Sequence, residues 1–154
     1  MHLHLLSGPV RTGKTTRLRR WLTSCPHAGG LLMPTDAAGR RYFLDVRSGL
    51  QWPADARPGQ WPVLRVGRFG FSPAAFAWAD AALRGAAAPP TEWLVLDEVG
   101  PLELRGQGLA PALAAVLAGA PLPRHLVLVV RQGLTEAVWQ RFGLHRWPHS
   151  PFWE

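Results

Sequence analysis

Apolar residues along this chain fall into two patterns, short continuous runs and longer stretches with helical spacing. The two clearest runs are Trp93–Asp97 and His125–Val130, which are rich in leucine and valine. Such runs are typical of parallel strands that are buried on both faces of a sheet. Shorter or alternating patterns predict further strands at Leu3–Leu6, Leu31–Met33, Arg40–Val46, Leu50–Trp52, Val63–Phe69 and Leu144–Trp147.

Stretches with helical spacing separate these runs. In the first stretch, Leu18, Trp21 and Leu22 recur at intervals of three and four residues, which places them on one helix face. Ser72 followed by Pro73 predicts the capped start of another helix. The predicted helices cover 16–24, 73–84, 109–117 and 135–142, and Thr135 is expected to cap the last of them.

Strands that alternate with helices predict an α/β fold, in which helices flank both faces of a mostly parallel central sheet. The exception is Arg40–Val46 with Leu50–Trp52, which predicts a small antiparallel hairpin. A length of 154 residues, with 47% hydrophobic and 18% charged residues, suits one globular domain over residues 1–154. In such a sheet, ligands bind at the carboxyl ends of the strands.

The composition argues against a membrane or secreted protein. No apolar run approaches the roughly 20 residues of a membrane span. The first predicted strand has no basic segment before it and no cleavage site after it, which is unlike a signal peptide. Cys25 is the single cysteine, so an internal disulfide framework is excluded and a reducing, cytoplasmic location is predicted.

The formal net charge of +7 raises the alternative of nucleic-acid binding. The arginines are scattered, however, with only Arg17, Arg19 and Arg20 and the pair Arg40–Arg41 close together. Most of the eight tryptophans lie inside apolar runs, where packing in the core explains them better than base stacking. Nucleic acid is therefore not the favoured partner.

The loop after the first strand carries the strongest chemical signal. Gly8–Thr15 matches the phosphate-loop or Walker A pattern G-x-x-x-x-G-K-[ST], between a predicted strand and a predicted helix. Its backbone N–H groups and the helix dipole favour a bound phosphate. Lys14, the only lysine of the chain, can reach the β- and γ-phosphates, and the Thr15 hydroxyl can ligate Mg²⁺. The predicted nucleotide-binding residues are Gly8, Pro9, Val10, Arg11, Thr12, Gly13, Lys14, Thr15 and Thr16.

A second chemical element follows the apolar run of residues 93–96. Asp97 has the position of a Walker B carboxylate, which would hold Mg²⁺ opposite the phosphate loop. Its neighbour Glu98 should point elsewhere and act as the base that polarises an attacking water. Arg131 directly follows the strand 125–130, so it should meet the loop and Asp97 at the same sheet edge. Asp followed by Glu favours hydrolysis over transfer to an acceptor.

Three segments together resemble a known family. Gly8–Thr16, Arg65–Gly70 and Asp97–Leu104 occur in the order and spacing of the small thermophile-type, or cancer-related, nucleoside-triphosphatases. This resemblance covers nearly the whole chain. It implies a single P-loop domain of RecA/kinase-like type that slowly hydrolyses several nucleoside triphosphates with Mg²⁺ as cofactor.

The chain departs from the family pattern at Arg11, where family loops usually carry glycine. Arg11 either adds a phosphate contact or alters the loop. Arg131 occupies the position of a residue that senses the γ-phosphate, so we assign it a catalytic role beside Lys14 and Glu98; a solvent-facing arginine is the alternative. Arg65 and Arg68 are expected to share one strand face, and the role of Glu103 stays open between functional and plain surface residue.

The leading hypothesis is Mg²⁺-dependent hydrolysis of nucleoside triphosphates. A small-molecule or nucleoside kinase is the first alternative, marked by transfer to an acceptor that outpaces hydrolysis. A nucleotide-dependent accessory protein that binds nucleic acid is the second, marked by steep salt dependence. The six histidines show no convincing ligand spacing, and no motif indicates the preferred base or the oligomeric state.

Overall fold

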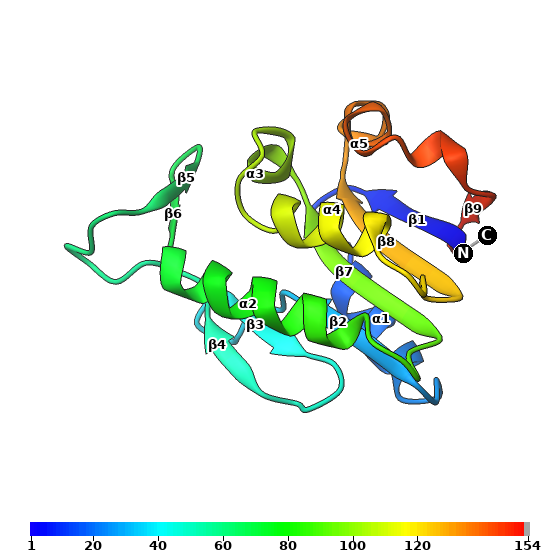
Figure 1. Cartoon of the computed structure of the whole chain (residues 1–154). Coiled ribbons are helices and arrows are strands. Elements are labelled where there is room, and N and C mark those ends of the chain that lie inside the picture. Colours follow the sequence, from blue (N-terminus) through cyan, green and yellow to red (C-terminus); the bar gives the residue numbers. More distant parts are fainter. Residues whose placement is uncertain (153–154) are drawn as a thin grey trace.

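The computed structural model describes residues 1–152 and contains a seven-stranded sheet with the strand order β4-β3-β2-β7-β8-β1-β9 (Figure 1). A separate two-stranded sheet is formed by β5 and β6. The strands are β1 His2–Gly8, β2 Ala28–Leu32, β3 Tyr42–Asp45, β4 Gln51–Pro53, β5 Leu64–Val66, β6 Phe69–Phe71, β7 Trp93–Val99, β8 His125–Arg131 and β9 His149–Pro151. The helices are α1 Lys14–Leu22, α2 Pro73–Ala86, α3 Pro101–Leu104, α4 Ala110–Ala118, α5 Thr135–Phe142 and the 3₁₀ helix η1 Leu144–Arg146.

The centre of the sheet is parallel, as the apolar runs predict. β7 pairs in parallel with β2 on one side and with β8 on the other, and β1 pairs in parallel with β8 and β9. Alternate residues of these strands enter two different cores. Leu94, Leu96 and Leu128 face a core that also contains residues of α2, α4 and α5, whereas Val95 and Val127 face a second core with residues of α1. Both faces of the sheet are therefore covered by helices (Figure 1).

The antiparallel part of the sheet lies at its other edge. β3 pairs with β2 and with β4 in antiparallel fashion, which confirms the predicted hairpin of residues 40–52. The predicted helix at residues 73–84 is also confirmed, because Ser72 Oγ accepts from the Ala75 N–H and Pro73 is the first helical residue.

The prediction of one strand over Val63–Phe69 is wrong. Residues 64–71 form a hairpin, in which β5 and β6 are joined by a two-residue turn at Gly67 and Arg68. Gly67 has a φ of +57°, a left-handed conformation that short hairpin turns need and that glycine adopts without strain. Arg65 lies on β5 opposite Gly70 while Arg68 lies in the turn, so they do not share one face of a strand. The hairpin extends away from the sheet (Figure 1).

The C-terminal part also differs from the prediction. Leu144–Arg146 forms a 3₁₀ helix, and the last described strand is β9, three residues further on. Thr135 is the first residue of α5 and gives no side-chain cap; the preceding residue Leu134 has the N-cap position. The four-residue helix α3 was not predicted, because one helical turn is too short to show a periodic pattern. No helix within residues 1–152 combines the length and apolar character that crossing a membrane requires.

Candidate functional site

The phosphate loop, the end of β7 and the end of β8 meet at one edge of the sheet. Gly8 at the end of β1 lies opposite Arg131 at the end of β8, so the loop begins level with this arginine. The phosphate loop and the ends of β7 and β8 border a cavity of about 1130 Å³. Residues 10–16 of the loop, Asp97, Glu98 and Arg131 all line it, as the order of strands predicts. Gly8 and Pro9 do not line the cavity.

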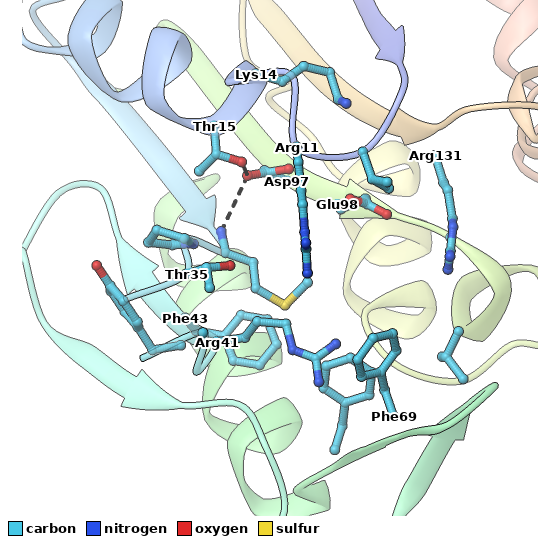
Figure 2. Close-up of a pocket in the computed structure, with 18 of the residues that line it drawn as sticks. Arg11, Lys14, Thr15, Thr35, Arg41, Phe43, Phe69, Asp97, Glu98 and Arg131 are labelled. Carbon is cyan, nitrogen blue, oxygen red and sulfur yellow. Dashed lines mark hydrogen bonds between the residues drawn. The ribbon is translucent and has the colours of Figure 1, made fainter. Parts of the chain in front are cut away.

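Two residues of the loop have a left-handed backbone conformation. Gly13, the N-cap of α1, has a φ of +78° and Arg11 has a φ of +59°. Because this conformation favours glycine, Arg11 occupies a position where glycine is the residue expected on conformational grounds. The Arg11 side chain is solvent-exposed at the loop and extends into the cavity (Figure 2).

Lys14 is folded back on the loop that it belongs to. Its Nζ donates to the carbonyl oxygen of Gly8 at 3.0 Å and also to that of Pro9. The Thr12 hydroxyl donates to the same Pro9 carbonyl at 2.8 Å. Gly8 and Pro9 do not face the cavity. Their carbonyl oxygens instead accept hydrogen bonds from the Lys14 ammonium group.

The two residues predicted to bind a metal are in direct contact. Thr15 Oγ1 donates a 2.6 Å hydrogen bond to Asp97 Oδ2, and the Met33 N–H lies 3.4 Å from the same oxygen. Asp97 is only 2% exposed, and burial together with the nearby Glu98 charge raises its pKa to about 6, although the Thr15 bond opposes this shift. A buried carboxylate beside a hydroxyl provides hard oxygen ligands of the kind that Mg²⁺ prefers. These residues therefore fit a magnesium ion.

A β-bulge turns Glu98 into the same cavity. Asp97 lies opposite Val129 and Val99 lies opposite Val130, so Glu98 is an extra residue in β7. A bulge re-aims side chains that would alternate in a regular strand. Both carboxylates line the cavity, so Glu98 lies in the same site as Asp97 (Figure 2).

Opposing effects act on the Glu98 carboxyl. Burial raises its pKa above the ordinary value, while the positive charges of Arg131, Lys14 and Arg41 act in the other direction. Arg131 thus lies close enough to Glu98 for its charge to lower the pKa of that carboxyl. Arg131 also lines the cavity. The catalytic roles of Lys14, Glu98 and Arg131 stay predictions.

Glu103 is a buried residue rather than a surface residue, and it lines the cavity as well. It is 4% exposed, and its carboxylate accepts hydrogen bonds from the N–H of Gly100 at 2.9 Å and of Leu109 at 3.0 Å. It thereby satisfies backbone donors at the start of α3 and at the residue before α4. The sequence left its role open, and the structure gives it a structural one.

The sequence did not identify the opposite wall of the cavity. There Arg41 is bound to Asp55 through Nε at 2.8 Å and also through Nη2. Its guanidinium carbon lies 4.2 Å from the ring centre of Phe69 and 4.3 Å from that of Phe71. Four phenylalanines contribute to this wall, Phe43, Phe69, Phe71 and Phe76. The pair Arg40–Arg41 in the sequence was its only visible signal, because these residues come from three separate elements.

The histidines do not form a metal site. His4 Nε2 lies 3.1 Å from His125 Nδ1, and His2 Nε2 lies 3.1 Å from Ser150 Oγ. The His125 ring stacks on Trp93 with ring centres 3.9 Å apart. Among residues 1–152, no group of three or more His, Cys, Asp or Glu side chains has an arrangement that could hold a metal ion. His2, His4, Trp93 and His125 lie near the first residues of β1, β7 and β8, at the sheet edge opposite the phosphate loop.

Two solved structures are similar to this chain over almost its whole length. THEP1 from the hyperthermophile Aquifex aeolicus matches with a TM-score of 0.73 and 16% identity, over 97% of this chain and 88% of that protein. A human cancer-related nucleoside triphosphatase matches with a TM-score of 0.67 and 23% identity, over 98% and 88%. The chain has the same α/β fold as these two proteins. The likeness is one of fold, and these two structures are of the kind that the sequence motifs resemble. No protein-family model and no curated protein sequence matches the chain.

Proposed function

We propose that this protein hydrolyses nucleoside triphosphates to diphosphate and phosphate, with Mg²⁺ as cofactor. The observation that carries the proposal is the 2.6 Å hydrogen bond between Thr15, at the end of the phosphate loop, and Asp97. Glu98 lines the same cavity. A hydroxyl, a buried carboxylate and a second carboxylate at this position are the parts that such chemistry needs. The two similar solved structures, one of them named a nucleoside triphosphatase, add support.

Each residue has a distinct part in this mechanism. The loop N–H groups bind the phosphates, and Lys14 exchanges the carbonyl oxygens of Gly8 and Pro9 for the β- and γ-phosphates. Thr15 and Asp97 would hold Mg²⁺, which neutralises developing charge on the phosphate oxygens when it is bound.

The remaining two side chains act at the γ-phosphate. Glu98 accepts a proton from the attacking water, and burial supports this role because it raises the pKa of the carboxyl above the usual value. Arg131, on the neighbouring strand β8, balances negative charge on the γ-phosphoryl group. We expect a location in the reducing cytoplasm, consistent with Cys25, whose pKa is raised by burial and whose thiol is therefore a weak nucleophile.

Steady-state phosphate release from a panel of nucleoside triphosphates tests the function. Lys14→Ala should lower kcat/KM by about 100-fold or more. Glu98→Gln should keep nucleotide binding while lowering kcat by about 100-fold or more, the usual contribution of a general base. Glu92→Gln is the matched control, because Glu92 is exposed and lies outside the cavity. Normal turnover by Glu98→Gln would refute the assignment of the base.

A further inference from the structure

The loop orients a bound triphosphate within the cavity. In a phosphate loop the backbone holds the α- and β-phosphates, the lysine reaches the β- and γ-phosphates, and the following Thr binds the metal. The nucleoside end then leaves along the start of α1, where Thr16 and Arg19 line the cavity. The γ-phosphate lies toward Glu98 and Arg131, on the far side of Lys14.

The cavity does not end at Glu98. It continues on the γ-phosphate side to the aromatic wall formed by Phe43, Phe69, Phe71 and Phe76. A water that attacks the γ-phosphate needs only about 30 Å³. The whole cavity, which includes the space for the triphosphate itself, measures about 1130 Å³. A pure hydrolase has no use for a roomy, aromatic-lined space behind its attacking water.

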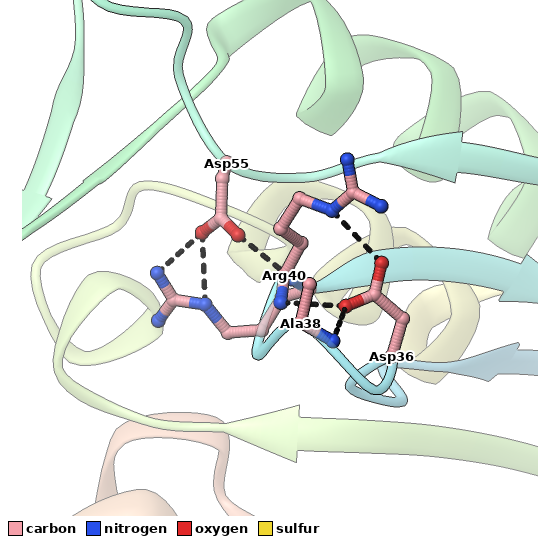
Figure 3. Close-up of polar contacts among 5 residues, drawn as sticks. Asp36, Ala38, Arg40 and Asp55 are labelled. Carbon is pink, nitrogen blue, oxygen red and sulfur yellow. Dashed lines mark hydrogen bonds and ion pairs between the residues drawn. The ribbon is translucent and has the colours of Figure 1, made fainter.

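Arg41 is fixed flat in this wall. Two nitrogens of its guanidinium bind Asp55, and the planar group lies against the rings of Phe69 and Phe71. The neighbouring Arg40 is different, since it bonds to Asp36 through Nε at 2.9 Å and its side chain is 77% exposed (Figure 3). The Asp55 carboxylate balances the charge of Arg41, and the guanidinium of Arg68, 5.1 Å from the centre of the Phe69 ring, adds a second arginine to this wall.

Phe69 provides an open stacking surface. It lies on β6 of the protruding hairpin and is 38% exposed, although it is a large apolar side chain. Figure 2 shows Phe69 and Arg41 on the side of the cavity opposite Lys14. Flat rings stack well on such aromatic and guanidinium faces.

We propose that this aromatic wall binds a second substrate, a nucleoside-like molecule with a planar, uncharged ring and a free hydroxyl group, which accepts the γ-phosphoryl group in place of water. The proposal rests on the proposed function, because it uses the same triphosphate and the same base. Glu98 stands between the γ-phosphate position and the wall, so it can receive the hydroxyl proton.

The transfer step balances without any further reactant. The acceptor oxygen forms a bond to the γ-phosphorus, and the bond from that phosphorus to the β–γ bridging oxygen breaks. The bridging oxygen keeps the electron pair and leaves with the nucleoside diphosphate. The hydroxyl proton passes to the Glu98 carboxylate. Without an acceptor, water takes the same position and hydrolysis is observed.

The test uses ATP labelled at the γ-phosphate, Mg²⁺, and adenosine, guanosine, cytidine and thymidine one at a time as acceptors. We expect label on at least one nucleoside in addition to the release of phosphate. Phe69→Ala should raise the KM for that nucleoside about 10-fold, the usual effect of losing one stacking partner. Phe69→Leu keeps an apolar residue on the hairpin and should show a similar rise, which separates stacking from folding. Arg40→Ala is the matched control and should leave both transfer and hydrolysis unchanged.

Two results would overturn this inference and leave the proposed function intact. One is phosphate release with no label on any of the four nucleosides. The other is transfer that occurs only when nucleoside monophosphates replace the nucleosides as acceptors, with the label in the nucleoside diphosphate, because that would require an anionic acceptor. Failure of the proposed function looks different, since neither phosphate release nor ATP binding would then be seen.

Discussion

Thr15 Oγ1 donates a 2.6 Å hydrogen bond to Asp97 Oδ2 and so joins two motifs that lie 82 residues apart in the sequence. The contact exists because β1 and β7 both end at the same edge of the parallel sheet, with only β8 between them. Thr15 is the second residue of α1, and Asp97 is held in place by the buried residues that precede it in β7. Thr15 and Asp97 therefore lie together at the end of the phosphate loop.

The first prediction concerns this pair. Asp97→Asn removes the charge that would attract Mg²⁺ but keeps the size of the side chain and an acceptor for Thr15. We expect Mg²⁺-dependent turnover to fall about 100-fold or more, with a smaller effect on metal-free nucleotide binding. Steady-state hydrolysis and equilibrium dialysis across a magnesium series measure the two effects. Full turnover by this variant at ordinary magnesium concentrations would exclude Asp97 as a metal ligand.

The second prediction separates two effects of Arg11. Its φ of +59° strains a residue with a Cβ atom, whereas its guanidinium reaches the cavity. Arg11→Gly removes both the strain and the guanidinium, while Arg11→Ala removes only the guanidinium. We expect the glycine variant to exceed the alanine variant in free energy of unfolding by about 1 kcal/mol. Urea denaturation of both variants measures this difference.

Both Arg11 variants should bind ATP more weakly than the wild type. Loss of a charged hydrogen bond to phosphate predicts a rise in KM of about 10-fold for each. Equal KM values for the wild type and the two variants would mean that the side chain does not contact the nucleotide.

The third prediction concerns the buried carboxylate of Glu103. It accepts two backbone hydrogen bonds, from Gly100 and Leu109, through its two oxygens. In Glu103→Gln one oxygen becomes an NH₂ group that faces a donor, so one buried N–H loses its partner. We expect the free energy of unfolding to fall by about 1–3 kcal/mol. Thermal or urea denaturation tests this, with Glu92→Gln at an exposed position as the control; equal stability of Glu103→Gln and wild type contradicts the structural role.

The fourth prediction is a pH dependence of stability that originates at His4. Burial lowers the pKa of His4 from its ordinary value of 6.5 to about 4, and the charges of His2 and His125 add to this effect. Between these two values the unfolded chain binds a proton that the folded chain does not. The contribution of His4 to stability is therefore complete above pH 6.5 and is lost as the pH falls toward 4.

Urea midpoints measured from pH 7.5 to 4 test this dependence. The wild type should lose stability more steeply than His4→Gln across the window. His145→Gln, at an exposed position, should follow the wild type. Parallel curves for the wild type and His4→Gln would show that His4 does not contribute to the slope.

The sequence by itself determined the features that depend on neighbouring residues. The apolar runs at 93–97 and 125–130 indicated central strands, because only strands buried on both faces need no polar residues. The glycine and lysine pattern of Gly8–Thr15 indicated the phosphate loop, and the position of Asp97 after its strand indicated the shared sheet edge. These predictions follow from local backbone preferences and from the rule that parallel strands present their carboxyl ends together.

Only the tertiary structure decided how the remaining side chains are placed. The bulge that turns Glu98 into the cavity depends on its pairing with β8, and the burial of Glu103 depends on the packing of two helices around it. The wall of Arg41 and Phe69 joins the residue before β3 to a separate hairpin. No local pattern encodes such contacts, because each partner alone resembles an ordinary surface residue until the chain brings them together.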